Sequence, residues 1–339
     1  QPGDTAAWFL AARTGRRLGR YPEAEQCLKR CQELGGVTDA TRLEWDLFRV
    51  QQGELGDIDK RLRMTIAPDH PDSAFVLEAL AHGYLKGERL RDVVDACELC
   101  LARQPDYPWP WLLRAKVFDQ LGNFNQAQAD YERALEKALH EREARLALGT
   151  LLARERHPGL AAEHFQYLLE RSPEDADALV GLADCRIEQG QPADAIQLLE
   201  PVLARDPVPR RGLFLRGKAA LEQLDAAGAE RWLAQAARQD PNDPQTLHQL
   251  TVALRAQGKH AEADPFALRL KALREDLSRL AELIRNIGRN PHDAKAWYDT
   301  GMLSLRLGRT EEGVSWLQGA LRAKGDHRPS HAALAEHFR

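Results

Sequence analysis

Apolar residues recur every three or four positions along most of the chain, in stretches that end in short turns. Residues 108–141 show the pattern clearly, because Trp111, Ala115 and Phe118 fall on one face of a helix. A second helical face begins after the turn at Leu121-Gly122-Asn123. The pattern predicts two amphipathic helices in a hairpin, neither of which can bury its apolar face alone.

The hairpin recurs with a period of 34 residues. Pro105, Pro173, Pro207 and Pro241 lie on that grid, and only Leu139 interrupts it. A proline repeated once per period marks the same helix end each time, because proline cannot continue a helix. Small residues recur at the eighth position of each period, at Ala81, Ala115, Gly149, Ala183 and Gly217. Small residues recur again at the twentieth position, at Ala127, Ala161, Ala195, Ala229 and Ala263. Self-similarity at a fixed period indicates a repeat architecture.

With this period and these positions the chain resembles the tetratricopeptide repeat (TPR) family, in the form of a bacterial-type multi-repeat scaffold. The resemblance implies an all-α fold, a right-handed α-α superhelical solenoid of about nine TPR hairpins plus a terminal helix. It divides the chain into an array of repeats 1–8 at residues 5–263, an elongated helix at 264–290, and a C-terminal TPR with a capping helix at 291–339. Repeat 2 is degenerate, because Asp59 and Arg63 occupy second-helix positions that are usually apolar or small.

The elongated helix is predicted from a break in the period. Pro291 follows Pro241 by one period plus 16 residues. The excess carries a heptad seam of Phe266, Leu270, Leu273, Leu277, Leu280, Ile284 and Ile287. Asp264-Pro265 suits an N-cap followed by the first helical residue, so the helix is expected over 265–289. We expect the seam to pack on repeat 9, and the alternative is a homodimer interface through 265–289.

Two motifs invite a chemical interpretation, and each has a stronger structural one. The stretch Gly212–Ala219 has nearly the spacing of a phosphate-binding P-loop, but Ala219 replaces the Ser or Thr that binds magnesium. It also lies within a predicted helix, so no nucleotide site is expected. Cys97 and Cys100 form a CxxC pair, yet both fall at core positions of a repeat, where cysteine acts as a small hydrophobe.

Histidines near the C-terminus are not expected to form a metal site. Pro329 separates His327 from His331, so the pair is not presented one helical turn apart, and His337 is expected at the surface. The sequence contains no GxSxG, HExxH or dinucleotide-binding glycine motif. The sequence therefore predicts no cofactor, no metal and no enzymatic activity.

Composition limits the partners. The formal net charge is −4, which gives no general attraction to nucleic acid, and charged residues make up 29% of the chain and interrupt every apolar run too early for a membrane span. The basic stretch from Arg13 to Arg20 is interpreted as a solvated face. Five cysteines at helical positions favour a reducing, cytoplasmic location. The chain begins Gln-Pro-Gly-Asp without an initiator Met, and we expect a trimmed N-terminus.

The resemblance also implies where binding takes place. In the family the first helix of each hairpin lines a concave groove, with positions 2, 5, 9, 12 and 13 facing inward. Those positions hold Arg13, Arg16, Glu44, Phe48, Glu78, His82, Trp109, Leu112, Lys116, Asp119, Asp184, Arg211, Phe214 and Lys218. Trp109 and Phe214 are expected to anchor a partner, unless they pack between neighbouring helices.

The expected function is a non-catalytic scaffold that holds a peptide or helix of a partner protein in this groove. Two alternatives remain. The chain is a regulatory or targeting array of a larger enzyme, such as a glycosyltransferase, kinase or protease, or it is a homodimerising assembly module.

Overall fold

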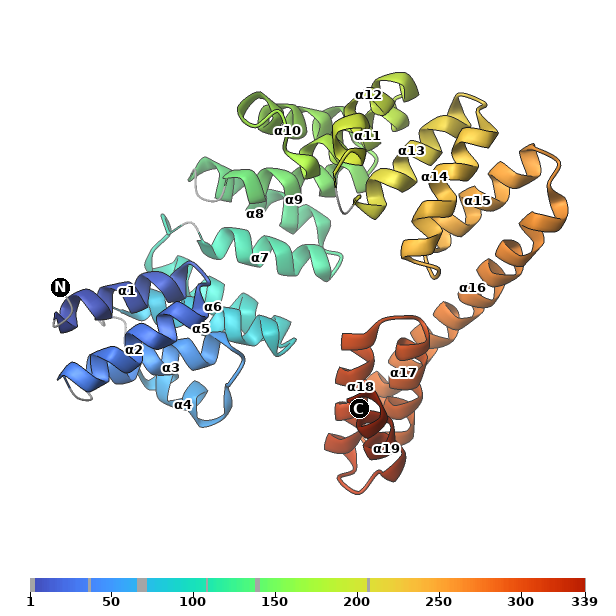
Figure 1. Cartoon of the computed structure of the whole chain (residues 1–339). Coiled ribbons are helices and arrows are strands. Elements are labelled where there is room, and N and C mark those ends of the chain that lie inside the picture. Colours follow the sequence, from blue (N-terminus) through green and yellow to red (C-terminus); the bar gives the residue numbers. More distant parts are fainter. Residues whose placement is uncertain are drawn as a thin grey trace. The chain divides into compact units, whose positions relative to one another are not determined.

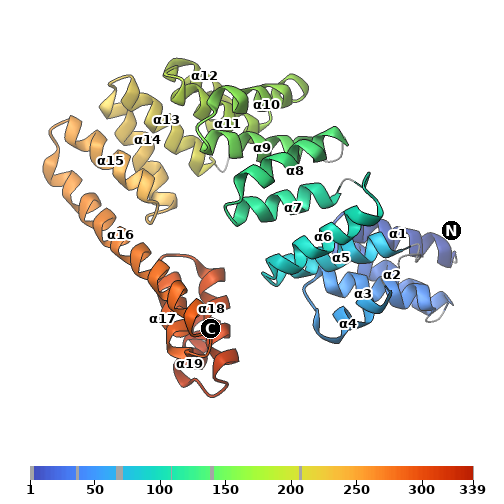
Figure 2. The same cartoon turned by 180° about the vertical axis from the view of Figure 1, so that it is seen from behind.

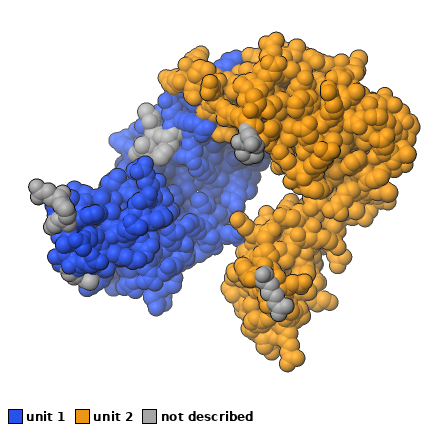
Figure 3. All heavy atoms as spheres, in the orientation of Figure 1, with its two compact units in different colours: residues 1–168 blue, residues 169–339 orange. Residues whose placement is uncertain are grey.

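The computed structural model describes residues 4–35, 38–65, 72–107, 109–137, 141–205 and 208–338, and Leu139 and Pro207 of the proline grid lie outside these ranges. The described residues form nineteen α-helices and no strand. They are arranged as consecutive antiparallel hairpins followed by one terminal helix, as predicted (Figure 1). The chain divides into two compact units, residues 1–168 and 169–339 (Figure 3).

Unit 1 contains five hairpins, and α10 runs a few residues past its end. Its helices are α1 (Thr5–Arg17), α2 (Tyr21–Gly35), α3 (Asp39–Gln51), α4 (Gly56–Thr65), α5 (Ser73–Lys86), α6 (Leu90–Arg103), α7 (Trp109–Gln120), α8 (Phe124–Glu136), α9 (Glu141–Arg154) and α10 (Pro158–Arg171).

Unit 2 contains four hairpins and the terminal helix. Its helices are α11 (Ala176–Glu188), α12 (Pro192–Leu203), α13 (Arg210–Glu222), α14 (Ala226–Gln239), α15 (Pro244–Ala256), α16 (His260–Arg289), α17 (Ala294–Arg306), α18 (Thr310–Ala323) and α19 (Arg328–His337). The terminal helix α19 packs on α17 and α18.

The small residues of the repeat lie where the two helices of a hairpin cross. A Cβ added at Gly217 in α13 would come within 2.5 Å of Leu233 Cγ in α14, and one at Gly149 in α9 would come within 2.9 Å of the Phe165 ring in α10. Ala127 in α8 is completely buried. The repeated small positions therefore let a large side chain of the other helix occupy the crossing.

Ala127→Leu is expected to reduce the free energy of unfolding by about 1–3 kcal/mol, because three extra carbon atoms must fit into a filled crossing. Ala129 lies on the exposed side of the same helix, so Ala129→Leu is the matched control and should change stability by less than about 0.5 kcal/mol. Urea unfolding followed by circular dichroism measures both variants. Equal midpoints for the two would show that the assigned register is wrong.

The elongated helix is present, but the predicted start was wrong. Helix α16 runs from His260 to Arg289, 30 residues, and contains Pro265 inside it (Figures 1 and 2). The turn at Gly258, where φ is +76°, leads directly into the helix, as Gly190 does between α11 and α12. Pro265 is tolerated because it lies only in the second turn, where it removes a single backbone hydrogen bond.

The heptad seam is used within unit 2. Leu270, Leu273 and Leu280 share a buried cluster with Leu247 of α15 and with Leu303 and Leu307 of α17. The seam thus packs on both neighbouring helices rather than on repeat 9 alone. Ile284 is the exception, with 41% of its surface exposed.

Candidate functional site

The candidate surface is the first-helix face of each unit, formed by positions 2, 5, 9, 12 and 13 of the first helices of successive hairpins. In unit 1 these helices are α1, α3, α5, α7 and α9, and in unit 2 they are α11, α13, α15 and α17. The residues predicted to bind a partner separate into a buried set and a solvent-accessible set. The buried set is Arg16, Glu44, Phe48, Trp109, Leu112 and Phe214.

Arg16 and Glu44 form a buried ion pair between α1 and α3. Only 2% of Arg16 and 3% of Glu44 is exposed. The Arg16 Nε group donates to the Glu44 carboxylate, and Nη1 donates to Gln51 Oε1 at 3.0 Å. The interpretation of Arg13–Arg20 as a solvated face is therefore wrong for Arg16. A guanidinium can be buried here because a carboxylate and an amide oxygen satisfy its donors.

The aromatic residues predicted as anchors pack between helices. Trp109 is 7% exposed and lies in the unit 1 core, with its ring 6.1 Å from that of Tyr107. Phe214 is 6% exposed and belongs to a core cluster of unit 2. Phe48 is likewise buried against Tyr21 and Trp45. Their geometry supports the packing alternative, since a partner cannot reach these rings without displacing neighbouring helices.

Most of the accessible set are charged residues, and several of them pair between adjacent first helices. In unit 1, Lys116 of α7 pairs with Glu143 of α9, and Asp119 pairs with Arg154. In unit 2, Arg211 Nη2 of α13 lies 2.5 Å from Asp184 Oδ2 of α11. The Lys116–Glu143 and Asp184–Arg211 pairs join equivalent positions of consecutive repeats, with opposite order of charge.

The remaining charged positions are also paired, but two of these pairs reach past α3, from α1 to the region of α5. Lys218 Nζ of α13 lies 2.5 Å from Glu188 Oε1 of α11. In unit 1, Glu78 of α5 lies 3.9 Å from Arg17 of α1, and Arg13 lies 3.5 Å from Asp72. The first-helix face thus presents alternating charges rather than one sign.

His82 lies in α5 among these charges. Burial, followed by the nearby positive charges of Lys116 and Arg16, lowers the pKa of its imidazole below the ordinary value. The lowered pKa favours the neutral imidazole, which has one hydrogen-bond donor and one acceptor.

Sequence reasoning missed several contributors to this face, namely the pair partners Glu143, Arg154 and Glu188 and an aromatic residue, Phe75. Phe75 occupies position 2 of repeat 3, so the register that selected Glu78 and His82 also points to it. The guanidinium carbons of Arg13 and Arg17 lie 5.2 and 4.9 Å from the centre of its ring. The Phe75 ring is half-buried and holds two cations over it, so it is an accessible aromatic side chain on the face of unit 1, whereas Trp109 is buried.

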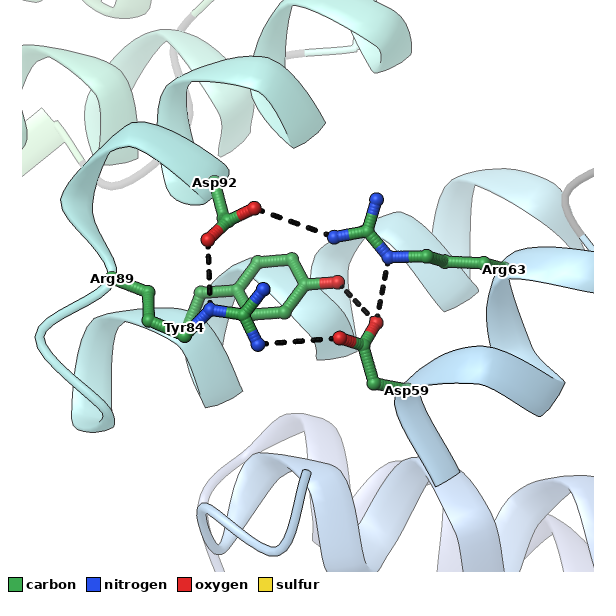
Figure 4. Close-up of polar contacts among 5 residues, drawn as sticks. All are labelled: Asp59, Arg63, Tyr84, Arg89 and Asp92. Carbon is green, nitrogen blue, oxygen red and sulfur yellow. Dashed lines mark hydrogen bonds and ion pairs between the residues drawn. The ribbon is translucent and has the colours of Figure 1, made fainter. Parts of the chain in front are cut away.

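A polar cluster joins the degenerate repeat to the repeat that follows it (Figure 4). Asp59 Oδ1 accepts hydrogen bonds from the Tyr84 hydroxyl at 2.5 Å and from Arg63 Nε at 2.8 Å, and Asp59 Oδ2 accepts one from Arg89 at 3.2 Å. Asp92 accepts from both arginines. Burial alone raises the pKa of Asp59, but the hydrogen bonds from Tyr84 and Arg63 bring it below the ordinary value.

This cluster is structural rather than catalytic. Tyr84 is almost fully buried, and its pKa is raised by burial and by its hydrogen bond to Asp59, so its hydroxyl is neither reachable by a substrate nor ready to lose its proton. Asp59 occupies the crossing position that holds Ala127 in repeat 4. The repeat keeps its hairpin because ionic hydrogen bonds replace the missing apolar contact there.

The other motifs also have structural places. Cys97 and Cys100 lie in the unit 1 core, and burial raises the pKa of the Cys100 thiol to about 12, so both thiols stay protonated. Gly212–Ala219 lies inside α13. His327 Nδ1 lies 2.8 Å from Ser330 Oγ and His331 Nε2 lies 2.9 Å from the Gly325 carbonyl oxygen, so both organise the start of α19.

Two kinds of site are missing from the described part of the chain. It contains no group of three or more His, Cys, Asp or Glu side chains placed to hold a metal ion. None of its helices combines the length and the apolar character that crossing a membrane demands.

Comparisons with known proteins agree on one family. Three family sequence profiles, each described as "Tetratricopeptide repeat", match residues 152–212, residues 112–159, 186–244 and 278–328, and residues 5–34. "Cellulose synthase operon protein C" of Pseudomonas fluorescens (strain SBW25) is 40% identical over 60 residues, which are 18% of this chain and 5% of that protein.

Among solved structures, PilW shows the same fold. PilW, described as a widely conserved type IV pilus biogenesis factor, is 20% identical with a TM-score of 0.52, over 59% of this chain and 92% of its own. A tetratricopeptide repeat protein from Parabacteroides merdae ATCC 43184 is 20% identical with a TM-score of 0.48, over 74% and 98% of the two chains. The likeness to PilW concerns the arrangement of helical hairpins.

Proposed function

The chain belongs to the tetratricopeptide repeat family, and on this premise we propose that it is a non-catalytic scaffold that binds a peptide or helix of a partner protein on its first-helix face. The observation that carries the proposal is the series of ion pairs between successive first helices, Lys116–Glu143, Asp119–Arg154, Asp184–Arg211 and Lys218–Glu188.

These pairs are poorly explained by stability. The side chains of Lys116 and Glu143 are 38% and 49% exposed, and pairs so accessible contribute about 0–1 kcal/mol each. A charged side chain of such a pair can leave its partner within the chain and pair with a charged group of a bound segment, at little cost in the stability of the fold. Pairing in the free protein also holds the side chains in one geometry, which reduces the entropy lost on binding.

The test compares three forms of the chain in affinity capture from the source organism's extract, followed by binding measurements with the purified partner. The face variant carries Lys116→Glu, Arg211→Glu and Lys218→Glu. The control variant carries Lys29→Glu, Arg133→Glu and Arg238→Glu, an equal charge change at exposed positions of second helices. We expect the face variant to lose at least tenfold in affinity while the control binds like the unmodified chain.

The result that contradicts the proposal is a partner bound equally by all three forms. A partner lost equally by the face variant and the control would show that net charge, rather than this face, governs binding. Thermal unfolding of each form checks that the substitutions leave the fold intact.

A second candidate function is regulation or targeting within a longer protein. It is favoured by the match to Cellulose synthase operon protein C, of which the chain covers 5%. The sequence of the complete gene tests it, and an open reading frame without a further domain would exclude it.

A further inference from the structure

The regular stacking of hairpins is interrupted at α16. Elsewhere in unit 2 each first helix packs on both helices of the preceding hairpin, as α13 does on α11 and α12, and α15 on α13 and α14. Helix α17 instead packs on the second half of α16 (Figures 1 and 2). The turn that follows α17 lies near the start of α15, since a Cβ added at Gly308 would come within 3.6 Å of Asn242 Nδ2. The place that the next first helix would occupy against α15 and the start of α16 is therefore left open.

A hollow of about 370 Å³ lies at that place. One wall is a face of α15 with His248, Thr251 and Arg255, spaced three and four residues apart. The other wall is a face of α16 with the same helical spacing, formed by Ala267, Leu270, Lys271, Arg274 and Glu275. The volume is within the range of protein ligand pockets.

The walls carry an excess of positive charge. Arg255, Lys271 and Arg274 are cationic, and Glu275 is the single carboxylate in the lining. Arg255 has a long ion pair of 3.8 Å with Asp264. Over the described part of the chain, Lys271 and Arg274 make no ion pair or side-chain hydrogen bond, whereas Lys116 and Lys218 are both paired.

The floor of the hollow is apolar. It consists of the partly exposed Ala267 and of the small part of Leu270, 6% of its surface, that remains accessible. The Thr251 hydroxyl donates to the Leu247 carbonyl oxygen at 2.7 Å, so its hydrogen is used within its own helix. A ligand must therefore combine an apolar strip for the floor with negative charge for the rim.

We propose that an amphipathic helix of a partner protein, with acidic residues beside an apolar stripe, docks in this hollow in the position of the absent first helix. The proposal rests on the proposed function in taking the partner to be a protein. A nucleic acid is the less suitable anion, because the lining offers no Phe, Tyr or Trp ring for base stacking. The apolar floor between two helices matches helix-in-groove recognition.

A displayed library of amphipathic helical peptides with randomised flanking charges, selected on the full chain, tests the proposal. We expect the selected peptides to be rich in Asp and Glu. Their affinity, measured by fluorescence anisotropy, should fall at least tenfold with Lys271→Glu and Arg274→Glu together. It should remain within about threefold with the charge-conserving pair Lys271→Arg and Arg274→Lys, or with Arg279→Glu and Arg285→Glu on exposed positions of the same helix.

Two outcomes of this experiment distinguish a failure of the inference from a failure of the proposed function. Peptides that lose binding to the Lys116, Arg211 and Lys218 variant but not to the Lys271 and Arg274 variant would overturn the inference and leave the first-helix face standing. A library that yields no binder to any form would overturn both. Inorganic phosphate and a single-stranded oligonucleotide serve as competitors, and an oligonucleotide that binds the hollow more tightly than the peptides would overturn the choice of a protein helix.

Discussion

Glu44→Ala is expected to reduce the free energy of unfolding of the α1–α3 region by about 3–5 kcal/mol, because it leaves the buried Arg16 guanidinium without a counter-charge. Gln51 remains as an acceptor for one donor only. A double variant, Arg16→Met with Glu44→Leu, should recover most of the lost free energy of unfolding. Apolar side chains of similar volume leave no buried charge that needs a partner.

Repeat arrays unfold in local blocks, so the measurement must be local. Hydrogen exchange of the backbone amides of α1, α2 and α3 reports the loss where it occurs. The matched control is Glu25→Ala in α2, whose exposed pair with Lys29 should contribute less than about 1 kcal/mol. Equal exchange rates in the Glu44 and Glu25 variants would contradict the assignment of a buried pair.

Asp59→Ala is expected to reduce the free energy of unfolding of α4, α5 and α6 by about 2–3 kcal/mol, again measured by hydrogen exchange of their backbone amides. The main cause is the Tyr84 hydroxyl, which stays buried after losing its acceptor, a loss of about 1–3 kcal/mol. Arg63 and Arg89 contribute less, because both guanidiniums are partly exposed and can return to water. Asp57→Ala, at an exposed position two residues earlier, should be nearly neutral. Tyr84→Phe combined with Asp59→Ala should recover part of the loss, because it removes the unpaired hydroxyl.

Acid should weaken this cluster in a defined direction. The pKa of Asp59 is lower in the folded protein than the ordinary value of about 3.9, so its contribution is fully present above that value and is lost as pH falls through the folded-state pKa. Asp59→Asn removes the titrating group. The protection of α4–α6 should therefore decline more steeply below about pH 4 in the unmodified chain than in the Asp59→Asn variant. Parallel declines in both proteins would show that other carboxylates govern acid unfolding.

The hairpins and their crossings were predictable because their signal is repeated. Ala127 at one crossing is confirmed by its burial, and Gly217 by the closeness of Leu233. A period defines which face a residue occupies, and small side chains at a fixed spacing indicate that another helix passes close by. The start of α16 was predicted wrongly because Asp264-Pro265 is a good local helix start. The helix instead begins directly after the turn at Gly258. The turns of the other hairpins also contain a residue with positive φ, although in three of them it is not glycine.

The binding residues were less predictable, because periodicity does not say how far a neighbouring helix covers a face. Trp109 and Lys116 belong to the same face of α7, yet the first is in the core and the second is accessible. Arg16 could not be recognised as buried, since its partners Glu44 and Gln51 are 28 and 35 residues away. The hollow beside α15 depends on the displacement of a helix, which no local pattern encodes.

The length of α16 has a consequence for orientation. It is 16 residues longer than the 14-residue α14, and each helical residue turns the chain by about 100° and advances it by 1.5 Å. Sixteen residues amount to about four full turns and about 160° more, with an advance of about 24 Å. An insertion of about 18 residues would be close to five whole turns and would point α17 in the direction it has in an uninterrupted array. The number of residues in α16 therefore sets the azimuth of α17, α18 and α19, and removing a single one would rotate all three together.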